Sequence, residues 1–544
     1  MAYSLKLKEL IKDSTDWNQL KAKLEQYNVD DRELKIKDTS AGFYFEEFCK
    51  LYYSFSPIYS NYFKNVWLFK EVPEQIKIKL NLTSIEHGVD LILESNEKEL
   101  FAVQCKFKND ENSKLNWSSD KIANLFGYCP NADGFIVFSN CSQIDNVSKS
   151  RSDNFTFVNV SDLLDIDAET FKLFNAKINN KEYKRDLFIP FGHQEKAIKE
   201  CKIWFEEADE NRGQLILPCG AGKTLIGLWL KERLFAKKTL VLVPSLALLR
   251  QTKNEWSKQS RYAYNYMCVC SEKDIDKQNS DGIVSYSYEV GGKVSTDPEI
   301  IRYFIKNNDD FVIFSTYQSL KSISIAIENI DFEFDYAFCD EAHKTAGINK
   351  GIFALIHDNE KVPIKRRLYT TATPRIVKES LKKKINQDLN YTHDMGDPKI
   401  YGEEFFRMTF KDAIDQKILV DYKILGIGIS DRQISDYIKE RRFVQGKLSI
   451  DEIANNYALN YVMKTYSANH ALTFHSRVKY AEDFSERHSK IFENINSYSV
   501  NGTQPTGTRN KILNLFRKSE KAVISNARCL TEGVDVPAID LVYF

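Results

Sequence analysis

A short loop between an apolar run and an apolar helix constrains the fold of this 544-residue chain more than any other feature. The stretch LILPCGAGKTLIG, residues 215–227, predicts a buried strand, a glycine-containing loop and a helix that opens with lysine and threonine. Glycine at positions 220 and 222 lets backbone N–H groups approach a phosphate without a Cβ clash. The N-terminus of the helix adds positive potential toward an anion. The segment therefore predicts a phosphate-binding loop in an α/β domain.

Each residue of this loop has an expected role in binding ATP and Mg²⁺. Lys223 can reach the β- and γ-phosphates, and the hydroxyl of Thr224 can ligate Mg²⁺. We expect three backbone N–H groups to contact the phosphates, those of Gly220, Ala221 and Gly222. The general pattern G-x-x-x-x-G-K-[ST] has a glycine where this chain has Leu217. A glycine turn between a strand and a helix also occurs without nucleotide, so the loop alone leaves that choice open.

An acidic pair supports the nucleotide-binding interpretation. Asp340 and Glu341 directly follow the apolar run YAFC, well after the phosphate loop in the chain. A carboxylate at the end of a buried strand can hold Mg²⁺, and we assign that role to Asp340. The neighbouring Glu341 can orient and deprotonate the attacking water. His343 completes the tetrapeptide DEAH.

Apolar runs alternate with helical stretches through the centre and the C-terminal part of the chain. Central strands are expected at 213–218, 239–244, 311–316, 336–340 and 366–373. A second series is expected to start near Asp421 with a strand in YKILGIGI, and to continue with strands at 471–476 and 522–526. Such alternation predicts buried parallel sheets, and hence an α/β protein.

The N-terminal segment GVDLILESNEKELFAVQCK predicts a β-hairpin whose second strand carries polar groups. Period-2 alternation places Gln104 and Lys106 on the same face, opposite Val103 and Cys105. If the first strand is adjacent, Asp90 can approach that polar face. Carboxylate and amide oxygens suit Mg²⁺, and a nearby lysine can orient or deprotonate a water and stabilise charge on a phosphate. The alternative is a solvated sheet face without chemistry.

Composition sets outer limits on function. The chain has 76 Lys and Arg against 76 Asp and Glu, so nucleic acid can bind only through local basic patches. None of the ten cysteines forms a C-x-x-C pair, which argues against a zinc ribbon or a disulfide framework. The N-terminus lacks a signal-peptide core and no stretch of 18 apolar residues occurs. We therefore expect a cytoplasmic protein without a membrane partner.

From about Asp186 to Phe544, the order of these segments is similar to that of superfamily 2 helicases and translocases. The matching segments are Phe191–Gln194 (the adenine-reading segment), Val243–Ser245 with Arg250–Thr252 (motif Ia), Ser315–Ser319, Thr371–Pro374 (motif III), Leu472–Val478 (motif IV) and Asn526–Pro537 (motif V). The resemblance implies two RecA-like lobes with ATP between them. It also implies that Gln194 reads adenine and that Gly533 and Asp535 belong to the nucleotide site.

The resemblance departs from the family pattern at the C-terminal end. Motif VI, a Q-x-x-G-R-x-x-R-type segment with the arginine finger, should follow motif V within about 30 residues, but the sequence stops at Phe544. An arginine finger is worth roughly 10³–10⁵ in rate. We therefore expect this chain to bind ATP but to hydrolyse it poorly, and we expect the second lobe to be incomplete.

The N-terminal module, about Thr39 to Val160, resembles the PD-(D/E)xK nucleases, and the glutamine resembles the Mrr-like branch. That family implies a Mg²⁺ site formed by Asp90 and Gln104, with Lys106 as a catalytic residue and Glu46 joining from the first helix. Single-chain Type ISP restriction enzymes join such a nuclease to such a motor. In those enzymes a methyltransferase and a target-recognition region follow, and here they would lie on a longer chain or a separate subunit.

These expectations give a domain plan and a function. We expect a helical lead-in at 1–38, a restriction-endonuclease-like domain at 39–168, a linker at 169–185, and RecA-like lobes at 186–395 and 396–544. The expected activity is ATP-dependent translocation on DNA, in duplex form, coupled to Mg²⁺-dependent cleavage for DNA defence. The alternatives are a DNA or RNA helicase whose N-terminal module only binds nucleic acid, and a truncated, inactive ATP-binding remnant.

Overall fold

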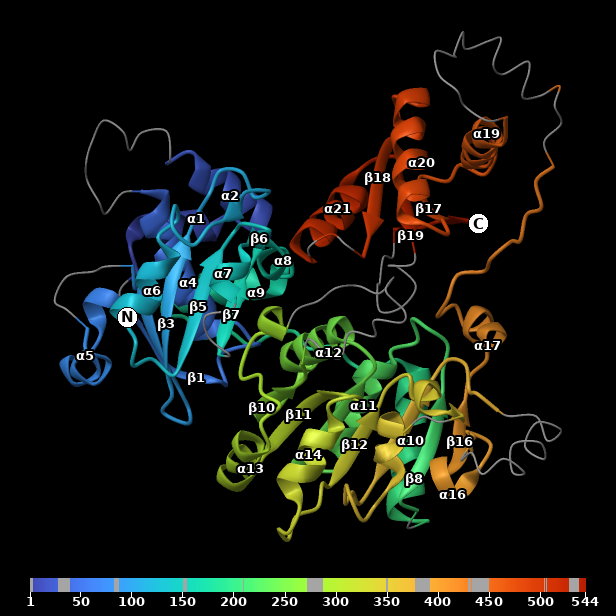
Figure 1. The fold of residues 1–544 in the computed structure, drawn as a ribbon. Helices are drawn as coiled ribbons and strands as arrows, with labels where there is room; N and C mark the ends of the chain where they lie inside the picture. Colours follow the sequence, from blue (N-terminus) through green and yellow to red (C-terminus); the bar gives the residue numbers. More distant parts are fainter. Residues whose placement is uncertain are drawn as a thin grey trace. The chain divides into compact units, whose positions relative to one another are not determined.

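The computed structural model describes residues 3–27, 40–82, 88–149, 154–208, 210–271, 287–348, 351–376, 392–428, 432, 450–502, 504, 506–527 and 538–544. The chain forms two compact units (Figure 1). The first comprises residues 1–274 and 285–420, and the second comprises residues 275–284 and 421–544. The first unit contains two large sheets with separate strand orders, so it holds an N-terminal domain and a larger α/β lobe.

The N-terminal domain is built on a five-stranded sheet with the order β1-β2-β3-β5-β7. Its strands are β1 (Phe63–Leu68), β2 (Leu91–Ser95), β3 (Leu100–Lys106), β5 (Gly134–Ser139) and β7 (Phe155–Val158). The first three strands pair antiparallel, and β3, β5 and β7 pair parallel. Helices α4 (Ala41–Phe55) and α9 (Ala168–Ile178) pack on one face, while α6 (Ile122–Tyr128) packs on the other.

The expected hairpin is confirmed as β2 and β3, with Leu91 paired to Val103 across the strands. Val103 and Cys105 lie in the core cluster that contains Phe45 of α4. Ala102 lies in the cluster on the opposite face, with residues of α6. The period-2 pattern therefore gives the correct faces, because a strand has no freedom to rotate single side chains to the other side.

The expected helical lead-in is an integral part of this domain. Helices α1 (Leu5–Lys12) and α2 (Trp17–Glu25) contribute buried residues to the core cluster of α4. The Trp17 indole donates to Glu111 Oε1 at 2.9 Å, and the backbone N–H of Ser4 donates to Glu47 Oε1 at 2.8 Å. Likewise α9, which we placed in a linker, buries Phe171 and Phe174 against the same core.

The larger lobe is a seven-stranded, all-parallel sheet with the order β10-β11-β9-β12-β14-β8-β16. Its strands are β8 (Arg212–Ile216), β9 (Lys238–Val243), β10 (Asn265–Val269), β11 (Phe311–Thr316), β12 (Tyr336–Cys339), β14 (Arg367–Thr371) and β16 (Glu403–Arg407). One face is covered by α10 (Gly192–Glu206), α11 (Lys223–Arg233) and α12 (Leu246–Gln259). The other face is covered by α13 (Pro298–Asn307) and α14 (Leu320–Ile327).

Two expectations are wrong: the boundary between the two lobes and the first strand of the second series. We placed residues 396–420 in the second lobe, but β16 pairs with β8 in the first sheet, and the first unit extends to Val420. The described part of YKILGIGI, residues 422–428, forms neither helix nor strand, and Tyr422 and Ile424 are exposed. Its β-branched and aromatic residues favour a strand, but a strand also needs a pairing partner, which propensity does not supply.

The second unit contains a four-stranded parallel sheet with the order β18-β19-β17-β20. Its strands are β17 (His470–Phe474), β18 (Asn496–Asn501), β19 (Ala522–Ala527) and β20 (Leu541–Tyr543). Its helices are α19 (Ile450–Thr465), α20 (Val478–Ile491) and α21 (Thr506–Lys518). Within the part of the chain that the structure describes, no helix is long and apolar enough to cross a membrane.

Candidate functional site

The phosphate loop lies between β8 and α11, at the C-terminal edge of the central sheet. Gly220 and Gly222 have φ values of +83° and +85°, the left-handed region that favours glycine. A Cβ on Gly222 would lie 2.2 Å from Nε2 of Gln194, so this position also has no space for a side chain. Helix α11 begins at Lys223, directly after the second glycine. The loop therefore has the geometry that an anion site at a helix N-terminus requires.

Lys223 and Asp340 lie in one charged group at this edge. Lys223 is buried, and its Nζ donates weakly to the carbonyl of Leu217 at 3.4 Å. Burial and the charge of Glu341 raise the pKa of Asp340, while the charge of Lys223 and a hydrogen bond from Thr370 oppose that rise. The Thr370 hydroxyl donates to Asp340 Oδ1 at 2.9 Å from the adjacent strand β14. The acid expected to hold Mg²⁺ is therefore fixed by a strand neighbour that we had not predicted.

Glu341 occupies a left-handed backbone conformation, with φ of +47°. Its Oε2 lies 3.3 Å from Nδ1 of His343, and the same ring nitrogen lies 2.9 Å from Oγ1 of Thr371. Burial would raise the pKa of Glu341, but the hydrogen bond with His343 and the charge of Lys223 lower it. The carboxylate is therefore ionised at neutral pH and able to accept a proton.

Gln194 is hydrogen-bonded to the protein at both ends of its amide. Its Nε2 donates to the carbonyl of Ala221 at 3.2 Å, and its Oε1 accepts from the N–H of Phe191 at 2.8 Å. The adjacent His193 also contacts the Ala221 carbonyl, at 3.1 Å. Gln194 thus ties its segment to the phosphate loop, and its role in reading adenine stays a prediction.

Other expected motor residues have different outcomes. Thr224 lies in the first turn of α11. Its backbone carbonyl accepts a hydrogen bond from the indole of Trp256 at 2.9 Å. Gly533 and Asp535 lie outside the described residues.

Arg250, in the segment similar to motif Ia, does not face solvent. Its guanidinium donates to Ser161, Asp162 and Asp165 of the N-terminal domain at 3.0–3.1 Å, so this side chain is unavailable to nucleic acid.

In the N-terminal domain, Asp90 lies directly before β2 and next to the end of β3. Its backbone N–H donates to the carbonyl of Val103 at 2.8 Å, and its Oδ2 accepts from the N–H of Cys105 at 2.6 Å. Continuing the antiparallel register from Leu91 and Val103 places Asp90 opposite Gln104. The hairpin therefore brings the two predicted metal ligands together.

Gln104 has a buried side-chain oxygen without a hydrogen-bond partner among the described residues. Its Nε2 donates to the carbonyl of Lys121 at 3.3 Å, whereas its Oε1 is buried and accepts no hydrogen bond from the described residues. Buried polar atoms nearly always have a partner, so an orphaned carbonyl oxygen beside a carboxylate needs an explanation. A hard divalent cation supplies one, because it prefers such oxygens. Asp90 and Gln104 therefore fit a divalent-cation site.

The two neighbouring glutamates of α4, Glu46 and Glu47, lie in different surroundings. Burial raises the pKa of Cys105, and the charges of Asp90 and Glu46 raise it further, so both carboxylates lie near this end of β3. Glu47 instead is 3% exposed and accepts two hydrogen bonds from Ser4. Glu47 is therefore structural, and Glu46 is the glutamate that α4 places near Asp90.

Two lysines lie at and just beyond the end of β3, and they differ in their partners. Lys108 forms an ion pair with Asp120. Lys106, the last residue of β3, has no ion pair with any described residue, and its positive charge helps to lower the pKa of Asp120 against the effect of burial. Asp120 was missed by the sequence interpretation, since nothing in its local pattern separates it from a surface acid. Lys106 is thus the lysine available to a substrate.

The described residues contain no group of three or more His, Cys, Asp or Glu that could hold a metal ion. Gln104 is an amide and so is not one of these residue types, and its role as a metal ligand stays a prediction. The sequence indicates that role only through the spacing of Gln104 and Lys106 on one strand face.

Comparison with known proteins agrees with this division of the chain. Residues 54–153 match a family model described as restriction endonuclease. Residues 187–376 match the model for the res subunit of Type III restriction enzymes, and residues 454–544 match the helicase conserved C-terminal domain.

Solved and curated relatives cover different shares of the chain. A DNA-bound ATP-dependent Type ISP restriction-modification enzyme, LlaBIII, is similar over 97% of this chain with 25% identity and a TM-score of 0.77, and 35% of that protein is covered. The probable helicase A859L of African swine fever virus (isolate Tick/Malawi/Lil 20-1/1983) is 24% identical over 335 residues, which are 61% of this chain and 35% of the relative. The chain thus spans about a third of the length of each.

This chain has the architecture of a superfamily 2 helicase with an N-terminal Mrr-like nuclease domain, and it resembles a Type ISP restriction enzyme over nearly its whole length.

Proposed function

We propose that this chain is an ATP-dependent DNA translocase coupled to a Mg²⁺-dependent endonuclease of a restriction system. The observation that carries the proposal is the presence of two complementary sites in one compact unit. One site combines the phosphate loop with Asp340 and Glu341, and the other combines Asp90 with the orphaned oxygen of Gln104. The similarity to a restriction enzyme bound to DNA favours DNA over RNA as the polymer.

In the motor, the protein groups would act on the γ-phosphate of ATP. Lys223 would offset negative charge on the phosphates, and Asp340 with Thr224 would hold Mg²⁺. Glu341 would accept the proton of the water that attacks the γ-phosphorus, while the bond to the β-phosphate oxygen breaks and ADP leaves. The ionised state of Glu341 supports this role, since only a carboxylate can take that proton.

In the nuclease, Asp90 and Gln104 would hold Mg²⁺, with Glu46 nearby. When bound, the ion would polarise the scissile phosphate. Lys106 would orient the attacking water and offset the negative charge that develops on the phosphate during hydrolysis. Lys108 would not compete for this role, because its ammonium group is held by Asp120.

The test is nicking of supercoiled plasmid by the full chain in Mg²⁺, with and without ATP. We expect nicking that Lys106→Ala reduces by at least about a hundredfold, since removal of one charge-stabilising donor typically costs 10²–10³ in rate. Asp90→Ala should also reduce nicking strongly, because it would remove a ligand of the metal ion. Lys114→Ala provides a matched control, because Lys114 lies exposed on β4 (Lys114–Leu115) of the same domain.

Different outcomes would select the alternatives. Plasmid nicking that survives Lys106→Ala would contradict the nuclease assignment. Plasmid binding without any nicking would favour an N-terminal module that only binds DNA. Binding of ATP that RNA strengthens and DNA does not would reverse the choice of polymer. Loss of ATP binding in Lys223→Ala, with binding retained in Lys237→Ala, would establish the motor site.

A further inference from the structure

The turn that joins β2 and β3 is held by a lysine of the motor lobe. Lys293 Nζ lies 2.6 Å from Oε2 of Glu97 and 2.8 Å from Oε1 of Glu99. All three side chains are largely buried, with exposures of 9% for Lys293, 14% for Glu97 and 25% for Glu99. Asn308, at the end of α13, also donates to Glu97 Oε1 at 3.1 Å. The hairpin that carries the nuclease residues is therefore clamped from the motor side.

The segment that presents Lys293, residues 287–294, is built into the nuclease core. Tyr288 lies in the same core cluster as Ile92 of β2, and Val290 lies in the cluster of Leu91 and Val103. We call residues 287–294 the strap. The strap is anchored to the motor sheet, because the N–H of Cys268 in β10 donates to the carbonyl of Lys293 at 2.8 Å.

Two glycines allow the strap to pass this closely. Gly291 and Gly292 have φ values of +73° and +80°. A Cβ on Gly291 would lie 2.4 Å from the hydroxyl of Tyr59, and one on Gly292 would lie 2.6 Å from the ring of Tyr266. The buried ammonium of Lys253 on α12 donates to the carbonyls of Val290 and Gly291 at 2.6 and 3.3 Å. The path of the strap is thus fixed from both domains.

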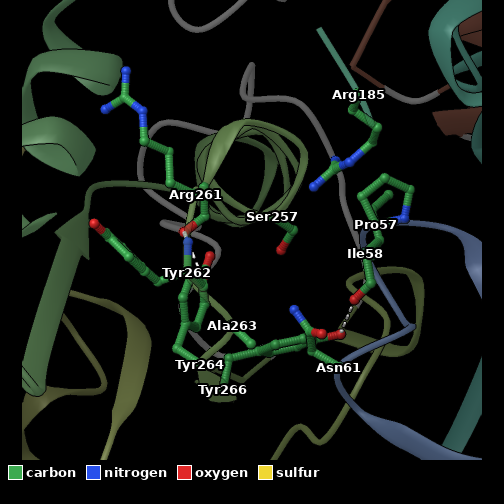
Figure 2. A pocket seen from close by; sticks show the side chains of 11 residues that line it. Pro57, Ile58, Asn61, Arg185, Ser257, Arg261, Tyr262, Ala263, Tyr264 and Tyr266 are labelled. Atoms are coloured by element: carbon green, nitrogen blue, oxygen red, sulfur yellow. Dashed lines mark hydrogen bonds between the residues drawn. The ribbon is translucent and has the colours of Figure 1, made fainter. Parts of the chain in front are cut away.

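The same domain boundary is held at a second place. Tyr266 of β10 donates its hydroxyl to the carbonyl of Ile58, beside a cavity of about 190 Å³ that both domains line (Figure 2). Arg250 of α12 bonds to three side chains in and beside α8 (Val160–Leu164). With α8 and the hairpin turn both fixed, the nuclease cannot pivot on the motor lobe without breaking buried ion pairs.

We propose that Lys293 is a positioning residue of the nuclease: by clamping Glu97 and Glu99 it sets the register in which the hairpin presents Asp90, Gln104 and Lys106. The turn and the site lie at opposite ends of β2, roughly 17 Å apart for five residues of strand. Without Lys293, two partly buried carboxylates would face each other, and their repulsion would open the turn. The proposal rests on the nuclease activity proposed above.

The experiment compares variants of the full chain in the plasmid-nicking assay. Lys293→Met is expected to lower the nicking rate ten- to a hundredfold, since a displacement of about 1 Å at a distance from the chemistry can cost 10²-fold. Lys293→Arg should retain most of the activity. Reversal of all three charges (K293E with E97K and E99K) should recover activity that K293E alone loses. Lys306→Met is the matched control, because Lys306 is exposed on neighbouring α13.

Affinity for ATP and the Tm separate positioning from simple loss of structure. We expect Lys293→Met to keep ATP affinity within about twofold and Tm within about 2 °C, and to raise the Mg²⁺ concentration that gives half-maximal nicking. Wild-type nicking in Lys293→Met would overturn the proposal. A parallel fall of nicking, ATP affinity and Tm would also overturn it, because Lys293 would then only hold the fold. A wild-type chain that never nicks would instead remove the nuclease function itself.

Discussion

At the scale of the residue, Gly222 shows how one position can serve two needs. Its backbone has a left-handed conformation, and its missing side chain makes room for Gln194 against the phosphate loop. The loop can therefore contact the segment that is expected to read adenine only because residue 222 has no Cβ. Any larger residue would disturb both, because the near neighbour is a buried amide with two hydrogen bonds.

We predict that Gly222→Ala weakens ATP binding at least tenfold and lowers the free energy of unfolding of the first unit by about 1–3 kcal/mol. The left-handed backbone alone costs an alanine about 1–2 kcal/mol, and the clash with Gln194 adds to that cost. Titration with a fluorescent ATP analogue and urea unfolding measure the two effects. Gly127→Ala is the control, since a Cβ there meets nothing within 4 Å.

The places of residues in the fold were predictable where the relevant segment is contiguous in sequence. Asp340 and Glu341 come right after an apolar run, and Lys223 opens an apolar helix after a glycine loop, so their places at the edge of a sheet could be expected. Thr370 could not, because it meets Asp340 only after two strands pair, and Asp120 could not, because nothing in its local pattern marks it as the partner of Lys108. Arg250 shows the converse, since a residue in a familiar segment binds the neighbouring domain instead.

At the scale of the element, the contact between α8 and α12 depends on a buried ion pair. Arg250 lies 3.0 Å from Asp162, and the guanidinium and this carboxylate are about nine-tenths buried. Burial raises the pKa of Asp162, and the charge of Arg250 works against that rise. The pair therefore stabilises the contact only while both charges are present.

We predict that Arg250→Met lowers the free energy of unfolding of the first unit by about 3–5 kcal/mol, because it leaves the Asp162 carboxylate buried without its partner. Adding Asp162→Asn should recover part of that loss. DNA affinity should change by less than about twofold, since the guanidinium is turned into the protein. A large loss of DNA affinity with unchanged stability would show that Arg250 contacts nucleic acid after all.

Elements were easier to predict than their membership of a sheet. The hairpin and five parallel strands of the first lobe follow from periodicity, which is a local property, whereas β10 was not expected. The assignment of β16 to the first lobe depends on pairing with β8, nearly 190 residues earlier in the chain, and no local pattern records it. For the same reason residues 422–428 resemble a strand in sequence but form none.

At the scale of the whole molecule, the two compact units have separate cores and separate titratable groups. In the second unit, His488 of α20 is buried and its Nδ1 lies 2.7 Å from the hydroxyl of Ser497. Burial lowers the pKa of His488 to about 4. Between about pH 6.5 and pH 4, His488 is therefore neutral in the folded unit but protonated in the unfolded chain, where its pKa has the usual value of about 6.5.

We predict that the second unit loses stability as the pH falls from about 6.5 to 4, by up to about 3 kcal/mol from His488 alone. The sign follows because the unfolded state binds more protons in this window, so acid favours unfolding. Hydrogen exchange of β17 and β19 as a function of pH measures the effect. In His488→Gln this dependence should be smaller, and an unchanged slope would contradict the assignment.

The left-handed backbone of Glu341 sets a limit on any attempt to make this protein more robust. Left-handed geometry outside glycine costs about 1–3 kcal/mol, and such cost persists at sites where function demands it. Glycine at this position would relieve the backbone but discard the carboxylate. A search for heat-tolerant variants would therefore favour glycine at residue 341, and such variants would lose the carboxylate that we propose activates water. Selection for stability and selection for the proposed ATP hydrolysis thus oppose each other at this position.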